Sequence, residues 1–200
     1  MLRACAALLA CHTPPKCYNL RVLNRKSITA VLLLFFCLML GACQQGYQRG
    51  NAQTPTYVYH EGYTPRLLPN GKATIPKHAP KRVKRAIAAA NKIVGKPYRS
   101  GGGHARHEDT AYDCSGSVAY VLREAGMLKK GAQPVSGYFL KWGRPGFGKW
   151  ITVYAKNGHV FMMIAGLRFD TTGSGRGVGP RWYTSSRRCS GFYVRRIPGY

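Results

Sequence analysis

Acidic residues are scarce in this sequence, which has 6 Asp+Glu against 31 Lys+Arg and a formal net charge of +25 at pH 7. This balance predicts attraction to polyanions, such as anionic lipid headgroups or the anionic polymers of a cell envelope. The basic residues are spread along the chain, with only short clusters at 77–85, 187–188 and 195–196. We therefore expect a generally basic surface and no dedicated nucleic-acid site.

Long apolar runs are also missing. The run at 28–40 is shorter than the roughly 20 residues that a membrane-spanning helix needs. It follows a basic stretch, 21–27, and precedes small residues that end at Cys43, which is the pattern of a secretory signal peptide. The stretch LGAC at 40–43 resembles the lipobox of bacterial lipoproteins, in which the cysteine is lipidated and becomes the first mature residue. An uncleaved signal anchor is the alternative interpretation.

The sequence thus predicts a signal peptide over 1–42, a lipidated N-terminus with a flexible linker over 43–80, and one folded domain over 81–200. The linker prediction depends on composition, because 44–80 is rich in Gly, Pro, Gln, Asn, Thr and Tyr and poor in aliphatic residues. Residues 1–20 do not fit a signal peptide, and one hypothesis is that translation begins near Val22 or Leu23. We expect an exported protein, lipid-anchored to a bacterial cell envelope. Gln44, in place of Asp, resembles the signal for the outer membrane of a two-membrane bacterium.

Cysteine is nearly absent from the predicted mature chain, which keeps Cys43, Cys114 and Cys189 of the seven in the sequence. Cys43 would carry the lipid. A disulfide between Cys114 and Cys189 is compatible with export. The polar neighbours of Cys114 favour a free thiol instead.

Apolar periodicity predicts helices first and strands afterwards. Residues 81–95 and a segment from about Cys114 to Gly126 have helical spacing. Alternation and turn residues predict strands at 150–155, 159–165, 167–171 and 191–197. This order indicates an α+β fold, with N-terminal helices packed on a small antiparallel β-sheet.

Three polar residues within this pattern suggest nucleophilic catalysis. Cys114 begins the second predicted helix, where free backbone N–H groups and the helix dipole stabilise a thiolate. His159 opens a strand, and a hairpin about the turn at 165–166 would bring Asp170 to its ring. These are the nucleophile, base and orienting group of Cys/His catalysis.

The residues around Cys114 are small or polar and suit a core poorly, so they leave room for a substrate backbone; they are Asp113, Ser115, Gly116 and Ser117. The preceding loop contains four residues that could ligate zinc, namely His104, His107, Glu108 and Asp109. Their spacing matches no strong zinc pattern. We predict a polar loop at the rim of the site, with no metal and no cofactor.

Three stretches resemble the motifs of the NlpC-type cell-wall peptidases, a papain-like family. They are YDCSGSVAYVLREAGML (112–128), which resembles the cysteine motif, NGHVFMMIAG (157–166), which resembles the histidine motif, and PYRSGGG (97–103), which resembles the stretch before the cysteine. The resemblance covers about residues 85–172 and implies a papain-like fold for the domain at 81–200.

The resemblance also assigns roles. It implies that Cys114 is the nucleophile and that His159 is the base. It also implies that Tyr98 and Ser115 contact the oxyanion or the substrate. It implies further that Asp113 turns away from the thiol and bonds to loop backbone. The family's third polar residue is often His, Asn or Gln and lies in the strand after the histidine. The resemblance makes Asp170 the candidate for this position, with Thr171 as its competitor, and an aspartate there is a departure from the family. The sequence departs from the family pattern at two further places, which are the longer loop between Tyr98 and Cys114 and the stretch WITVYAKNG before His159.

The function implied is that of a cysteine endopeptidase that hydrolyses amide bonds in peptidoglycan stem or cross-link peptides during cell-wall remodelling or turnover. The expected partners are peptidoglycan peptides, a membrane reached through the lipid, and anionic envelope polymers or lipids. Two alternatives stay open. One is a thiol amidase or acyltransferase on the same fold, and the other is a non-catalytic cell-wall-binding lipoprotein.

Overall fold

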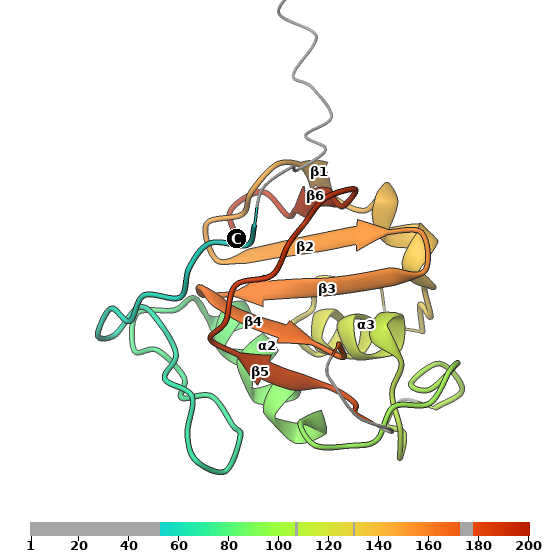
Figure 1. Ribbon diagram of the computed structural model, residues 1–200, viewed down its shortest axis with the longest axis horizontal. Helices are drawn as coiled ribbons and strands as arrows, with labels where there is room; N and C mark the ends of the chain where they lie inside the picture. The colour runs from blue at the N-terminus through green and yellow to red at the C-terminus, as the bar shows by residue number, and fades with distance from the viewer. Residues whose placement is uncertain (1–52, 107, 130, 173–177) are drawn as a thin grey trace, which may run out of the picture. The chain divides into compact units, whose positions relative to one another are not determined.

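The computed structural model describes residues 53–106, 108–129, 131–172 and 178–200 (Figure 1). All of them lie in the second of two compact units, Gly46–Tyr200. The predicted signal peptide and the predicted lipidation residue, Cys43, lie outside the described residues. Within these ranges, no helix is both long and apolar enough to cross a membrane.

The two α-helices of this part of the chain are α2, Lys81–Ile93, and α3, Cys114–Glu124. Both were predicted from apolar spacing. Helix α2 buries one stripe of apolar side chains and ends before Gly95, whose φ of 82° suits only glycine well. Helix α3 is buried on every side from Cys114 to Leu122. It is therefore an internal element, and its first turn is fixed by packing.

Six strands form one sheet in the order β1-β6-β2-β3-β4-β5, and every neighbouring pair is antiparallel. Four strands correspond to predicted ones: β2 (Ile151–Lys156), β3 (His159–Ile164), β4 (Leu167–Asp170) and β6 (Tyr193–Arg196). Three short elements were not predicted: β1 (Arg144–Pro145), β5 (Arg181–Tyr183) and the 3-10 helix η1 (Ser136–Leu140). Two or three residues carry too little alternation to reveal a strand.

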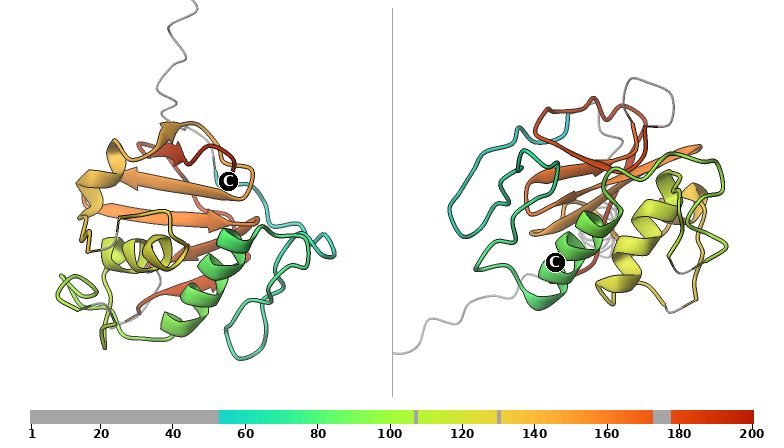
Figure 2. Two further views of the ribbon diagram at one scale, coloured as in Figure 1. Left: turned by 180° about the vertical axis from the view of Figure 1, so that it is seen from behind. Right: turned by 90° about the horizontal axis from the view of Figure 1, so that it is seen from below.

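The two helices lie together on one face of the sheet (Figure 2). They pack against each other, and both contact β3, with α3 making the larger contact. The fold is therefore α+β, as predicted. The packing of α3 on β3 places Cys114, at the start of the helix, near His159, at the start of the strand.

The β3–β4 hairpin also has the predicted turn. Ile164 pairs with Leu167, and the two turn residues, Ala165 and Gly166, have positive φ values of 50° and 86°. Such a turn matches the twist of the flanking strands. Continued along the strands, this register puts His159 and Asp170 on the same face as diagonal neighbours.

The described part of the expected linker, 53–80, is folded against the domain. Thr54, Ala73 and Ala79 are buried. The Asn91 side chain of α2 accepts a hydrogen bond from the Ala73 N–H at 2.9 Å and donates one to the Ala73 carbonyl at 2.8 Å. The structure thus differs from the expectation, because backbone hydrogen bonds to the domain order this segment despite its shortage of aliphatic residues.

Candidate active site

The Asp113 carboxylate caps the first turn of α3. Its Oδ1 accepts a hydrogen bond from the Gly116 N–H at 2.7 Å, and its Oδ2 accepts one from the Gly101 N–H at 3.0 Å. An N-cap aspartate satisfies a helix N–H that has no partner within the helix. The expectation that Asp113 bonds to loop backbone is confirmed, and the same carboxylate joins the glycine-rich loop to the start of the helix.

The glycine-rich loop packs directly on this first turn. A Cβ added at Gly116 would lie 2.0 Å from the Gly102 carbonyl oxygen and 3.1 Å from the Gly103 Cα. Since those atoms belong to the backbone, a side chain at Gly116 would push the loop away from the helix. The loop therefore passes close to the first turn of α3, the turn that begins with Cys114.

We expect Gly116→Ala to lower the free energy of unfolding by about 2 kcal/mol, because the new methyl group overpacks against backbone. Urea denaturation followed by circular dichroism would measure the loss. Gly137→Ala is the matched control, since a Cβ there meets no described atom within 4 Å, and we expect a change within about 0.5 kcal/mol. Equal values for the two variants would contradict the close approach.

Cys114 and His159 interact through their side chains. Burial lowers the pKa of His159, but hydrogen bonds with Asp170 and Cys114 and the charges of both partners outweigh burial and raise it. The His159 Nε2 lies 3.1 Å from the Asp170 Oδ1, which leaves Nδ1 as the ring nitrogen available to the thiol. Cys114 is a free cysteine and is 7% exposed. The structure therefore brings together the three residues that the sequence singled out.

The Asp170 carboxylate is buried and shared among four groups. Its Oδ1 contacts the His159 ring and accepts a hydrogen bond from the Thr172 N–H at 3.0 Å. Its Oδ2 accepts hydrogen bonds at 2.7 Å from both Arg168 and Arg187. Burial raises the pKa of Asp170, but the His159 hydrogen bond, the charges of Arg187 and His159 and the Thr172 N–H lower it overall. Asp170 is therefore held ionised beside the His159 ring.

Sequence reasoning missed the groups around this carboxylate. Arg168 stands two positions before Asp170 on β4 and so shares its face, a signal that could have been found. Arg187 is one of many basic residues, and nothing in its local sequence marks it. The Thr172 hydroxyl lies 3.0 Å from the His159 Nε2. Thus Asp170 and Thr172 bond to the ring, and among the described residues no such bond is seen for Thr171.

Tyr98 lies near the thiol, on the loop before α3. The Tyr112 N–H bonds to the Pro97 carbonyl at 3.0 Å, which fixes the loop beside the residues that precede Cys114. Burial raises the pKa of Tyr98, and the charges of Cys114 and Asp113 raise it further. The side chain is 42% exposed, so its protonated hydroxyl is available as a hydrogen-bond donor.

The Ser115 hydroxyl is bonded within the cap of α3. It donates to the Asp113 Oδ1 at 3.0 Å and lies 3.2 Å from the His104 Nε2. His104 also lies 3.1 Å from Asp113. These two residues therefore hold the cap. The first N–H groups of a helix have no partner within it, and no hydrogen bond to another described residue is seen for the backbone N–H groups of Cys114 and Ser115.

The candidate zinc residues that can be described have structural partners. The Asp109 carboxylate bonds to Arg99 and to the Gly103 N–H at 3.0 Å, while His104 bonds to Asp113. His107 lies outside the described residues. In the part of the chain that the structure describes, no group of three or more His, Cys, Asp or Glu could hold a metal ion.

Cys189 is a second free thiol and is buried.

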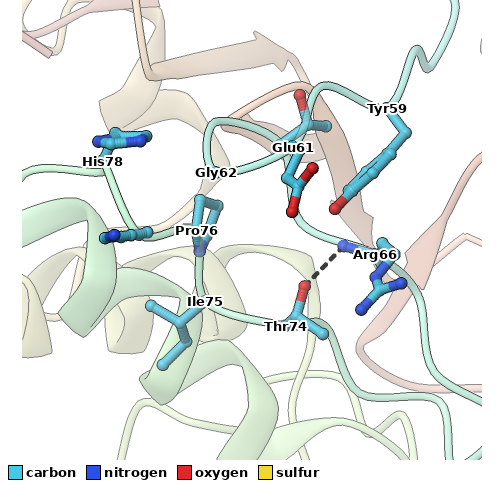
Figure 3. Close-up of a pocket in the computed structure, with 10 residues that line it drawn as sticks. Tyr59, Glu61, Gly62, Arg66, Thr74, Ile75, Pro76 and His78 are labelled. Atoms are coloured by element: carbon cyan, nitrogen blue, oxygen red, sulfur yellow. Dashed lines mark hydrogen bonds between the residues drawn. The ribbon is translucent and has the colours of Figure 1, made fainter.

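A separate pocket of about 400 Å³ opens in the segment that precedes α2 (Figure 3). Its lining residues all lie between Tyr59 and His78, and Glu61 and Arg66 are among them. The Arg66 guanidinium lies over the Tyr59 ring at 5.6 Å. None of the lining residues belongs to the Cys114 centre.

No protein-family model matches this chain, and no curated protein matches it.

Proposed function

We propose that this protein is a cysteine peptidase that hydrolyses amide bonds in peptidoglycan stem or cross-link peptides. One observation carries the proposal: the Cys114 thiol at the start of α3 interacts with the His159 ring, whose Nε2 lies 3.1 Å from the buried Asp170 carboxylate. A nucleophile, a base and a group that orients the base are what acyl transfer by a thiol requires.

The substrate class is supported by the sequence. The cysteine and histidine motifs resemble those of the NlpC-type peptidases, and a helix with a leading cysteine against a strand with a leading histidine is consistent with papain-like packing. The signal peptide and lipobox pattern before Cys43 supports export and attachment to an envelope membrane. The net charge of +25 favours contact with an anionic wall or its lipids.

In the first half of the reaction, the Cys114 thiolate attacks the carbonyl carbon of the amide while His159 carries the thiol proton. A carbon–sulfur bond forms, and the carbonyl oxygen becomes an oxyanion. The Cys114 N–H and the Tyr98 hydroxyl stabilise this oxyanion by hydrogen bonds. His159 then gives its proton to the amine, the carbon–nitrogen bond breaks, and an acyl-enzyme remains.

In the second half, water replaces the departed amine. His159 takes a proton from this water, which attacks the thioester carbonyl. The carbon–sulfur bond breaks, the peptide leaves as a carboxylic acid, and the thiol and imidazole are restored. Asp170 acts through His159, because its carboxylate orients the ring and stabilises the imidazolium in both halves.

The test is digestion of purified peptidoglycan by the full chain and by Cys114→Ala, with released fragments identified by mass spectrometry. We expect the wild-type protein to release peptide fragments and the variant to release none, because a methyl group cannot act as the nucleophile. The new fragment termini identify the amide bond. Ser136→Ala, at the start of η1, is a control that should behave as wild type.

Release by wild type and Cys114→Ala alike would rule out the thiol mechanism. A lack of release from every wall type would rule out the hydrolase.

A further inference from the structure

The beginning of the described chain pairs with the loop between β5 and β6. Gln53 and Arg188 form an antiparallel β-bridge. The Thr54 N–H donates to the Arg187 carbonyl at 2.7 Å, and the Thr54 Oγ1 accepts from the Arg187 N–H at 2.8 Å. Thr54 is 3% exposed. Residues 53–54, called the arm below and drawn in cyan in Figure 1, thus fix the backbone of Arg187 through both its N–H and its carbonyl.

The Arg187 side chain extends from this fixed backbone to Asp170. Its guanidinium lies 5.0 Å from the centre of the Phe161 ring and 5.5 Å from that of Phe192. The two rings and the 2.7 Å bond to the Asp170 Oδ2 give the guanidinium one defined position. The Arg187 Nε is buried and has no hydrogen-bond partner among the described residues.

The same loop holds the second arginine. The Arg168 guanidinium bonds to the Ser185 carbonyl and lies 3.3 Å from the Ser185 hydroxyl. The Ser186 hydroxyl in turn bonds to the Gln53 side chain at 3.3 Å. Both cations that bind the Asp170 Oδ2 are therefore supported by the loop at 184–188, to which the arm is bonded.

The contacts continue from Asp170 to the candidate nucleophile. The Asp170 Oδ2 bonds to the two arginines and the Oδ1 bonds to His159. Because both oxygens belong to one rigid carboxylate, a rotation that moves Oδ2 also moves Oδ1. The His159 ring in turn interacts with the Cys114 thiol. An unbroken series of contacts thus links Thr54 to Cys114, across residues that are distant in the sequence.

We propose that the arm is a positioning element of the Cys114 centre, with Arg187 as the residue that transmits its position to Asp170 and His159. Docking of residues 53–54 on the loop sets the orientation of the Asp170 carboxylate and hence the reactivity of Cys114. This proposal takes the identity of the reacting centre from the proposed function, but it does not depend on the substrate.

The test is the rate of Cys114 alkylation by iodoacetamide as a function of pH, read at the Cys114 peptide by mass spectrometry. The full chain carries Thr54→Val, which keeps the side-chain shape and removes the Oγ1 acceptor. Thr54→Ser restores that acceptor. Thr74→Val is the matched control. The Thr74 Oγ1 accepts a hydrogen bond of 2.8 Å from the Arg66 N–H, and neither residue belongs to the loop at 184–188.

We expect Thr54→Val to slow alkylation near neutral pH by roughly ten-fold, since a small misplacement of a reacting group is costly. Its alkylation rate should approach that of free cysteine measured alongside it. Thr54→Ser and Thr74→Val should keep the wild-type rate and profile. Arg187→Met removes the bond between Arg187 and Asp170 and should reproduce the alkylation profile of Thr54→Val. This second variant keeps the proposal testable if Thr54→Val does not fold.

Three results would overturn the proposal: a wild-type profile in both Thr54→Val and Arg187→Met, a profile in Thr54→Ser as altered as that of Thr54→Val, or an equal loss in Thr74→Val. These outcomes are separate from those of peptidoglycan digestion. If the alkylation profiles behave as expected but no fragments are released, the positioning role stands and the proposed substrate is wrong.

Discussion

Asp170→Ala is expected to cost about 3–5 kcal/mol in the free energy of unfolding at pH 7. The carboxylate is fully buried and lies 2.7 Å from Arg168 and 2.7 Å from Arg187. Its removal leaves two partly desolvated cations without their shared anion, and loss of one partner of a buried ion pair is much more costly than loss of a surface pair. Urea denaturation at pH 7 would measure the change.

The sign of the pH dependence follows from the lowered pKa of Asp170. A carboxyl with a folded-state pKa below its unfolded value stabilises the protein above the unfolded value, about 3.9, and that stabilisation is lost as pH falls through the folded-state pKa. The difference between wild type and Asp170→Ala should therefore shrink below about pH 4. Glu61→Gln, at an exposed acidic residue, should change stability by less than about 0.5 kcal/mol. A cost for Asp170→Ala no larger than that of the control would contradict the network.

His159→Gln is expected to reduce hydrolysis by about 10²–10⁴-fold, the usual contribution of a general acid–base. Glutamine keeps a polar side chain near Asp170 but cannot accept the thiol proton or carry a positive charge. Alkylation of Cys114 at neutral pH should slow as well, because the thiolate loses the imidazolium beside it. Both rates would be measured on the full chain, the first by fragment release from peptidoglycan and the second with iodoacetamide.

The control for this variant is His78→Gln. His78 stacks on Tyr63 with ring centroids 4.7 Å apart, in the segment that precedes α2, and its substitution should leave both rates unchanged. The raised pKa of His159 adds a second check. An ionisation of the imidazole above the usual pKa of histidine, visible in the wild-type alkylation profile, should disappear in His159→Gln. An unchanged profile would mean that the ring does not act on the thiol.

The sequence alone was sufficient wherever the signal was local. Helical spacing located α2 and α3, and alternation with the turn at Ala165 and Gly166 located β2, β3 and β4. The hairpin pattern by itself made Asp170 a neighbour of His159, because strand register is a local property once the turn is known. The placement of Cys114 at a helix start followed in the same way from the helical spacing of the apolar residues after it.

Composition misled in one place. The segment at 53–80 looked like a tether because it is poor in aliphatic side chains. Its order comes from backbone hydrogen bonds to Asn91 and Arg187, and a segment's composition does not reveal which distant group its backbone will meet.

Tertiary structure decided the rest of the candidate site. The packing of α3 on β3 brings Cys114 to His159, and the return of the chain at 184–188 brings Arg187 to Asp170. These contacts join residues far apart in the sequence, and their formation depends on how the layers pack, so no local pattern encodes them. The sequence by itself determined which residues could form the proposed thiol acyl-transfer centre. Only the folded chain decided that Asp170 is shared by His159 and two arginines, because three segments must meet at one buried carboxylate.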